Sequence, residues 1–164
     1  MAADIIYELL TPEREEQARD LVREVFAAFV APGFSSTGRI AFEAFLCRSS
    51  FSRRSGRGFA LAARRAGGIV GVIDVADGGH VALFFVSGEH RGRGVGRTLM
   101  RLAGERCLRD LPTPGRMTVN ASPGSVGAYA AMGFVPAGGE EERDGIRFVP
   151  MVLALDEPEK PAAP

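Results

Sequence analysis

The stretch EHRGRGVGRTLM, residues 89–100, places glycines at positions 92, 94 and 96 among three arginines and then continues into helix-forming residues. Backbone amides at the start of a helix have no partner within the helix, and the helix dipole adds partial positive charge there. Glycine lets an anion approach such amides closely, and arginine neutralises its charge. The stretch therefore predicts a phosphate-binding loop that opens a helix.

Two common phosphate motifs do not fit this loop. A G-x-G-x-x-G pattern would need glycine at position 97, where the chain has Arg97, and no Lys-Ser/Thr pair follows as in a P-loop. The loop instead has the pattern Arg91-x-x-Gly94-x-Gly96, which follows the apolar run HVALFFV at residues 80–86. A solvated arginine–glycine loop without a ligand is the alternative.

The rest of the chain predicts an α+β fold with helices on both faces of a mixed sheet. Residues 59–86 form three apolar runs separated by glycine-rich turns, which is typical of an antiparallel meander. The run 81–86 is apolar throughout, so its strand should be covered on both faces. A first helix, after Thr11 and Pro12, should bury one stripe, and a second, capped by Ser36 or Thr37, follows it. The stripe comprises Ala18, Leu21, Val22, Val25, Phe26 and Phe29, and the second helix carries Ile40, Phe42, Phe45 and Leu46.

Two longer segments, HVALFFVSGEHRGRGVGRTLM and VNASPGSVGAYAAMGFVP, resemble the GNAT acyltransferases. The first matches that family's strand, [Q/R]-x-x-G-x-[G/A] loop and helix, and the second its N-x-S-P and Y-x-x-x-G-F segment. The order of elements fits over nearly the whole chain. The resemblance implies one GNAT-type domain over residues 1–155, and the charged, proline-rich residues 156–164 should form a disordered tail. It also implies an N-acetyltransferase that moves an acetyl group from acetyl-CoA to a primary amine by direct attack, without a metal.

The resemblance also implies which residues bind acetyl-CoA. In relatives the fourth and fifth strands splay apart, and the fourth strand offers backbone groups to the pantetheine arm. The residues matched to the arm are Phe84, Phe85 and Val86, with Asn120 and Ser125 as further contacts. Those matched to the pyrophosphate are Arg91, Gly92, Arg93, Gly94, Val95, Gly96, Arg97 and Thr98.

Two side chains are candidates for proton transfer. Tyr129 matches the tyrosine that protonates the departing CoA thiolate, and the alternative is a packed aromatic with a satisfied hydroxyl. His80 lies where some relatives place a glutamate base, and the alternative is an exposed histidine beside a turn. Asp74 is a weaker base candidate, and His90 is expected to be solvated or adjacent to phosphate. A strand amide near Phe85 or Val86 could stabilise the oxyanion.

Composition narrows the function classes. The formal net charge is zero, so the chain as a whole carries no electrostatic footprint for nucleic acid or membrane. The start of the chain does not resemble a signal peptide, and no apolar run has the length of a membrane span. Cys47 and Cys107 lie far apart without metal-ligand spacing, so we expect free thiols in a cytoplasmic protein.

Other hypotheses remain open at this point. The acceptor amine should bind around residues 31–39 and the last hairpin, where Phe34 and Phe51 could line a pocket or belong to the core. The arginine-rich segment 48–58 makes a nucleic-acid-associated module an alternative, and a non-catalytic acyl-CoA-binding domain is another. The apolar final strand, residues 148–155, would suit a sheet edge shared in a homodimer.

Overall fold

The computed structural model describes residues 4–48, 51, 58–110 and 115–155. These residues form a mixed sheet of eight strands with helices on both faces, which confirms the predicted α+β class. The segments 52–57 and 156–164, predicted to be a basic loop and a disordered tail, lie outside the described residues. No helix in the described part of the chain has both the length and the apolar character needed to cross a membrane.

The sheet has the order β1-β2-β3-β4-β5-β8-β6, and β7 pairs with β8. Every neighbouring pair is antiparallel except β4 and β5, which run parallel. The strands are β1 (Ile6–Leu9), β2 (Phe59–Arg65), β3 (Gly68–Ala76), β4 (His80–Val86), β5 (Arg116–Ala121), β6 (Val135–Pro136), β7 (Glu141–Arg143) and β8 (Ile146–Ala154). The predicted meander corresponds to β2, β3 and β4 and is confirmed.

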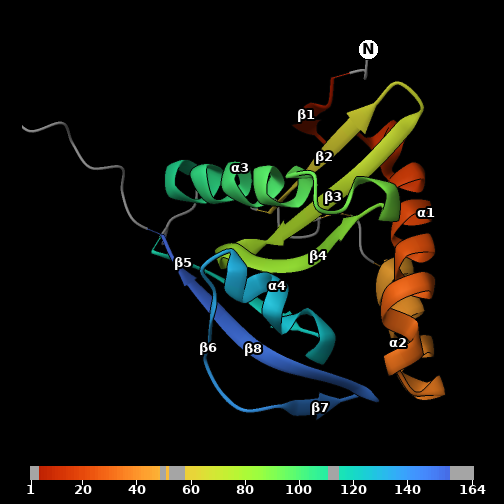
Figure 1. Cartoon of the computed structure of the whole chain (residues 1–164), viewed down its shortest axis with the longest axis vertical. Coiled ribbons are helices and arrows are strands. Elements are labelled where there is room, and N and C mark those ends of the chain that lie inside the picture. Colours follow the sequence, from red (N-terminus) through yellow and green to blue (C-terminus); the bar gives the residue numbers. More distant parts are fainter. Residues whose placement is uncertain (1–3, 49–50, 52–57, 111–114, 156–164) are drawn as a thin grey trace, which may run out of the picture.

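The helices divide between the two faces of the sheet (Figure 1). The α-helices are α1 (Glu15–Val25), α2 (Ser36–Arg48), α3 (Val95–Asp110) and α4 (Val126–Ala131). A π-helical turn, Phe26–Val30, extends α1, and 3₁₀ turns occupy Pro12–Arg14, Ala31–Gly33, Asp77–Gly79, Gly88–His90 and Pro123–Ser125. Side chains of α3 and α4 pack in one core cluster, while α1 and α2 contribute to the other.

Strand β4 contributes to both core clusters, as its uniformly apolar sequence predicts. Val81 and Phe84 pack with the side chains of α3 and α4, whereas Leu83 and Phe85 pack with those of α1 and α2. Successive residues of a strand face opposite sides of the sheet, and the extra residue Ala82 shifts this alternation by one between Val81 and Leu83. A strand covered on both faces therefore needs apolar residues at every position.

Several local predictions for the first two helices are corrected by the structure. Phe29 is not part of the buried stripe, because the π-helical turn carries it outward and leaves 53% of it exposed. The second helix begins one residue earlier than predicted, with Ser35 as its cap, and the Ser35 hydroxyl accepts a hydrogen bond from the Gly38 amide. Ile40 is also exposed, while Leu46 is buried as expected.

The final strand is not a sheet edge. β8 pairs with β5 over residues 149–154 and with β6 and β7 on its other side, so it has neighbours on both sides. The argument for a homodimer through this strand is therefore wrong, because an unpaired edge is what a shared sheet requires.

One irregularity in β4 shapes the centre of the sheet. The register between β3 and β4 shifts between Asp74 and Val75, which leaves Ala82 as an extra residue in β4. A β-bulge of this kind bends its strand and increases its twist. β4 pairs with β5 only at His80 and Val81, directly before the bulge, and from there the two strands diverge.

Candidate active site

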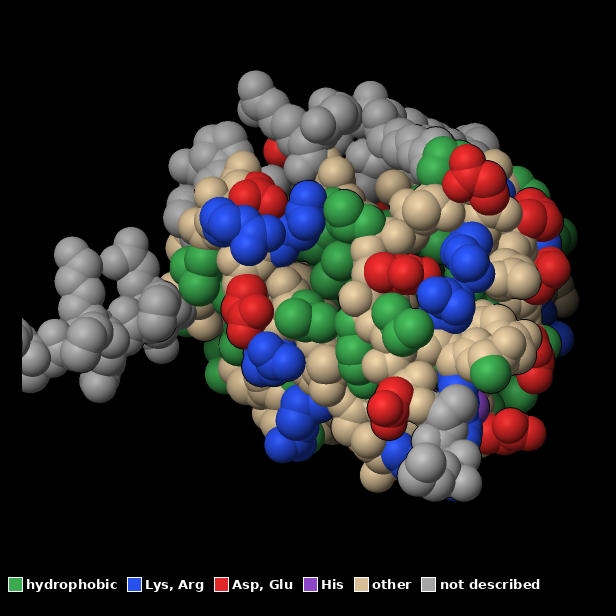
Figure 2. All heavy atoms as spheres, turned by 90° about the horizontal axis from the view of Figure 1, so that it is seen from above, with side chains coloured by type: hydrophobic (Ala, Val, Ile, Leu, Met, Phe, Trp, Pro, Cys, Tyr) green, Lys and Arg blue, Asp and Glu red, His purple; other side chains and the backbone are tan. Residues whose placement is uncertain are grey.

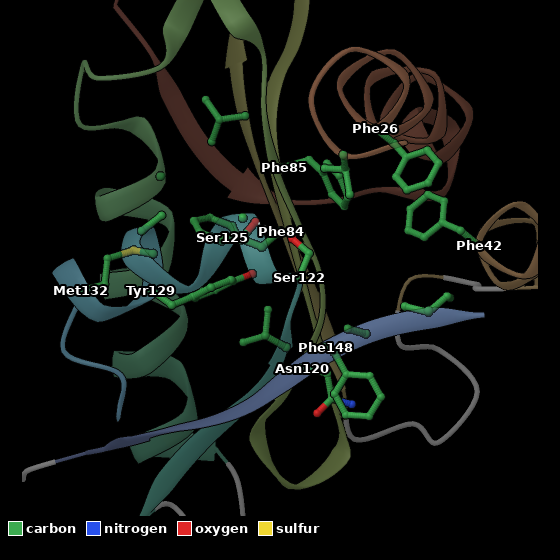
Figure 3. A pocket seen from close by; sticks show the side chains of 18 of the residues that line it. Phe26, Phe42, Phe84, Phe85, Asn120, Ser122, Ser125, Tyr129, Met132 and Phe148 are labelled. Carbon is green, nitrogen blue, oxygen red and sulfur yellow. Dashed lines mark hydrogen bonds between the residues drawn. The ribbon is translucent and has the colours of Figure 1, made fainter. Parts of the chain in front are cut away.

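The divergence of β4 and β5 opens a cleft of about 1370 Å³ through the sheet. Figure 3 shows Phe26 and Phe42 on the α1 and α2 side of this cleft. On the α4 side it shows Tyr129, Met132 and Ser125. The cleft thus joins the glycine-rich loop 91–96 on one face of the sheet to an aromatic end on the other.

The free edge of β4 can be assigned from its hydrogen bonds. The Ser87 amide donates to the Val70 carbonyl with an N···O distance of 2.8 Å. Successive amides of a strand point to opposite sides, so the Phe85 amide also faces β3 while the amides of Phe84 and Val86 face the cleft. The sequence had assigned Phe84, Phe85 and Val86 to the pantetheine arm together, without distinguishing which amides face the cleft. Phe85 instead places its side chain toward Phe42, with 6.0 Å between the ring centroids.

The predicted phosphate loop forms a turn that only glycine adopts easily. Gly92 and Gly94 have φ angles of 71° and 84°, in the left-handed region, and both line the cleft. α3 then begins at Val95, so the amides of its first residues have no partner within the helix. The Thr98 amide differs, because it donates to the Gly94 carbonyl at 2.9 Å.

Gly96 serves a different purpose from the two glycines before it. A Cβ at this position would lie 3.2 Å from Cζ of Phe84 and 3.5 Å from a methyl carbon of Val86. Its missing side chain therefore lets the start of α3 approach β4, which brings the free helix amides close to the free strand edge.

The arginines of the loop are exposed, and Arg91 and Arg97 line the cleft, whereas Arg93 does not. The Arg91 guanidinium carbon lies 3.8 Å from the centroid of the Phe29 ring. A cation held over an aromatic face in this way keeps its charge and loses side-chain freedom. The outward turn of Phe29 thus fixes one of the loop's positive charges.

His90 is buried, so the first of its two expected environments, a solvated one, is wrong, while the second, next to the phosphate, stays a prediction. Its Nδ1 lies 2.7 Å from the Ser87 hydroxyl, and its Nε2 lies 3.3 Å from a guanidinium nitrogen of Arg65. Arginine can only donate, so Nε2 accepts and the proton sits on Nδ1. His90 therefore ties the phosphate loop to β2 and to the end of β4.

Tyr129 is buried within α4, and its hydroxyl points toward the middle of the cleft (Figure 3). Its ring lies 6.0 Å from Phe84 and 5.4 Å from Phe134 between centroids. Within the described part of the chain, the hydroxyl makes no hydrogen bond. Burial raises the pKa of this hydroxyl, so it carries its proton at neutral pH and can donate it.

His80 begins β4 and also lines the cleft. It is half-buried, and its Nδ1 lies 2.9 Å from the Thr118 hydroxyl. Burial lowers the pKa of the imidazole, so the ring is neutral at pH 7 and able to accept a proton. Asp74, the weaker candidate, is 2% exposed and does not line the cleft, which removes it from consideration as the base.

Three polar residues, one at the end of β5 and two in the turn that follows it, line the cleft. Asn120 and Ser125 both line the cleft, as does Ser122, which the sequence did not single out. The hydroxyl oxygens of Ser122 and Ser125 lie 2.7 Å apart and share a hydrogen bond, which holds both side chains in place. The 3₁₀ turn between them, with Pro123, holds this pair at the start of α4.

Neither cysteine belongs to the cleft, and both are free thiols, as predicted. Burial and the nearby Asp110 raise the pKa of Cys107 to about 11, so its thiol stays protonated at neutral pH. Cys47 is exposed on α2, with its sulfur 3.3 Å from a Glu43 carboxylate oxygen. Among the described residues, no three His, Cys, Asp or Glu side chains are grouped to hold a metal ion.

The aromatic end of the cleft is the part that sequence reasoning largely missed. Phe26 and Phe42 fitted the apolar spacing of helices and were predicted simply as helix-face residues, although both line the cleft. Phe34 and Phe51 were each predicted to line a pocket or to belong to the core. Phe34 lines the cleft, whereas Phe51 is buried in the core against α1 and β3. Helical spacing cannot distinguish a side chain that faces a cavity from one that faces the core.

The described residues on the face seen in Figure 2 carry charges of both signs. Acidic and basic side chains are interspersed over the face seen in Figure 2, and the formal net charge is zero. Recognition of nucleic acid would favour a concentrated basic stripe or patch, which the described residues on this face do not form.

Comparisons with known proteins agree with this geometry. The acetyltransferase (GNAT) domain model matches residues 30–155. Among solved structures, a GCN5-related N-acetyltransferase from Rhodopseudomonas palustris is 22% identical, with a TM-score of 0.71 over 94% of this chain and 98% of that one. A GNAT-family acetyltransferase from Staphylococcus aureus Mu50 is 15% identical, with a TM-score of 0.68 over 93% of this chain and 100% of that one. At such identities the likeness shows the fold alone. No curated protein matches significantly in sequence. The match over residues 30–155 shows that this chain belongs to the GNAT acetyltransferase family and is an acyltransferase.

Proposed function

We propose that the protein is an N-acetyltransferase that moves the acetyl group of acetyl-CoA directly to a primary amine. The observation that carries the proposal is the free edge of β4, which lies between the phosphate loop and the hydroxyl of Tyr129. A strand edge, an anion cradle and a proton donor around one cleft match the three parts of a thioester substrate: its arm, its pyrophosphate and its leaving sulfur.

The cleft residues divide the binding of acetyl-CoA between them. The amides at the start of α3, with Arg91 and Arg97, would hold the pyrophosphate, because free helix amides and cations both favour a phosphate. The backbone of Phe84 and Val86 would pair with the pantetheine arm as a neighbouring strand does. Asn120 and Ser125 would contact the arm from the opposite wall.

The same residues offer the groups that acyl transfer requires. The amides of Phe84 and Val86 face the cleft and are our candidates for stabilising the negative charge that develops on the carbonyl oxygen, and that of Phe84 lies nearer to His80 along the strand. Tyr129 would give its proton to the thiolate as the C–S bond breaks. Because burial raises its pKa, the hydroxyl is in the protonated form when this step begins.

Release of the CoA thiol tests the proposal. The purified protein is incubated with acetyl-CoA and a panel of amines, amino acids, peptides and polyamines, and free thiol is followed over time. We expect release well above the rate without amine for at least one class, with the acetylated amine detected by mass. Thermal stabilisation by acetyl-CoA without turnover on any amine would instead support a non-catalytic acyl-CoA-binding domain.

We further propose His80 as the base that accepts the amine's proton, and its pH dependence is testable. Protonated His80 cannot accept a proton, so the rate should fall as the pH drops through its lowered pKa. In His80→Gln this acidic limb should shift or vanish, with the rate at pH 7 reduced by roughly tenfold or more and acetyl-CoA affinity unchanged.

The second histidine provides the control. His90→Gln should keep the acidic limb of the pH–rate profile and weaken acetyl-CoA binding, because His90 holds the phosphate loop. A pH–rate profile in His80→Gln that matches the parent would assign proton removal to a water chain or to the free fraction of the amine.

A further inference from the structure

The end of the cleft toward α1 and α2 forms an aromatic lobe, built from five phenylalanines. The ring of Phe26 stacks on that of Phe42 at 3.9 Å and meets Phe34 edge-on at 5.2 Å. The aromatic lobe comprises Phe26, Phe34, Phe42, Phe85 and Phe148, all of which line the cleft. Such a surface favours an apolar, preferably aromatic, group of the acceptor.

The charged side chains that line the cleft are mostly arginines, although β7 beside it also carries Glu141 and Glu142. Asp144 is the one carboxylate among the described residues that line the cleft, whereas arginine occurs at four lining positions. Two of these, Arg143 and Arg147, lie at the lobe. Arg147 is paired with Glu140 at 2.8 Å, but Arg143 makes no ion pair with any described residue. Its guanidinium carbon lies 5.6 Å from the centroid of the Phe148 ring. An unpaired cation beside apolar rings suits a carboxylate better than an ammonium group.

The turn between β7 and β8 packs against the start of α2 beside the lobe. The backbone of Gly38 approaches the Gly145 carbonyl so closely that a Cβ on Gly38 has no room. The Ser35 hydroxyl also donates to the Gly145 carbonyl at 3.2 Å. These contacts tie the turn between β7 and β8 to the start of α2 and so form a wall of the lobe on that side. A compact acceptor fits such a lobe better than a polypeptide segment.

We propose that the acceptor is a small amphiphilic amine, namely an α-amino acid with a large apolar or aromatic side chain. The side chain occupies the aromatic lobe, the carboxylate binds Arg143, and the amine lies near His80 and the free edge of β4. The N–C bond forms at the acetyl carbonyl as the C–S bond breaks, and the proton lost by the amine is balanced by the one the thiolate gains. This inference rests on the proposed acetyl transfer.

A series of acceptors tests the class. Values of kcat/KM are measured for phenylalanine, phenylalanine amide, alanine and spermidine with the same acetyl-CoA concentration. We expect phenylalanine to exceed alanine by about ten- to a hundredfold, because the aromatic lobe buries the benzyl group. Phenylalanine should exceed its amide by about tenfold, because the amide lacks the charge that Arg143 binds. Spermidine should be the poorest acceptor.

Matched variants connect these preferences to the residues. Arg143→Gln should bring phenylalanine and its amide to similar kcat/KM values. Arg116→Gln, at an exposed arginine outside the cleft, should leave their ratio unchanged. Phe34→Ala should reduce the preference for phenylalanine over alanine by about tenfold, with the KM for acetyl-CoA unchanged.

The outcomes separate this inference from the proposed function. Faster transfer to spermidine or alanine than to phenylalanine, or an acid-to-amide ratio insensitive to Arg143→Gln, would overturn the acceptor class while leaving acetyl transfer intact. No thiol release with any amine would overturn the acetyl transfer itself.

Discussion

Replacing Tyr129 with phenylalanine should lower kcat and kcat/KM together, by roughly ten- to a thousandfold, with acetyl-CoA bound nearly as tightly as before. The ring packs against Phe84 and Phe134, and these contacts do not involve the hydroxyl, so the variant should fold normally. A proton donor to the leaving thiolate acts in the transition state, and its loss therefore affects the chemical step more than binding. Steady-state kinetics and a thermal melt of the same sample measure both properties.

The chain offers a matched control, since its other tyrosine is Tyr7 on β1, away from the cleft. Tyr7→Phe should retain the parent kcat. An acyl donor with a more acidic thiol needs less help from a proton donor, so the defect of Tyr129→Phe should shrink with such a donor. Parental activity in a folded Tyr129→Phe protein would leave Tyr129 as a packing residue beside the cleft.

Gly94→Val should abolish the thermal stabilisation that acetyl-CoA gives to the parent protein. Saturation at a hundred times Kd is worth about 2.7 kcal/mol, which corresponds to a rise in Tm of roughly 5–10 °C for a chain of this size. Gly94 has a φ of 84°, which a β-branched residue adopts only with strain, so the loop must rearrange and its amides lose their common direction. Differential scanning fluorimetry with and without acetyl-CoA measures the effect.

The variant Gly78→Val is the control for the effect of backbone strain alone. Gly78 has a φ of 80° in the turn between β3 and β4, so valine there is strained to a similar extent. This variant should melt lower than the parent and still gain the full shift from acetyl-CoA. Gly96→Val should fail for another reason, because its side chain would push against Phe84 and lift α3 from β4. A full shift in a folded Gly94→Val protein would refute the phosphate-loop assignment.

The sequence predicted the order of elements and the layers well, because apolar spacing and glycine turns are local signals. The sequence-based prediction was wrong where one extra residue changed the local backbone geometry of a helix or strand. The π-helical turn that exposes Phe29 and the extra residue Ala82 in β4 depend on contacts between distant segments. Neither has a signature in the apolar pattern, since a π-turn and a bulge each shift the register by one residue without altering composition.

The candidate site was predicted in part for the same reason. The loop around Gly94 and the neighbourhood of Tyr129 have motifs that a single sequence displays. The aromatic lobe has none, because Phe26 and Phe42 look like core residues until the fold separates β4 from β5. The sequence placed His90 in the loop but could not show that it is buried, because its partner Arg65 lies on another strand.

The short pairing of β4 with β5 also bears on how the molecule holds together. Only His80 and Val81 join the half of the sheet made by β1 to β4 to the half made by β5 to β8 through backbone ladder bonds. The sheet is therefore weakly paired between β4 and β5, and the cleft lies along this junction. If a substrate arm pairs with β4 as proposed, its backbone hydrogen bonds would add to this short ladder, so ligand binding would stabilise the junction between the two halves of the sheet.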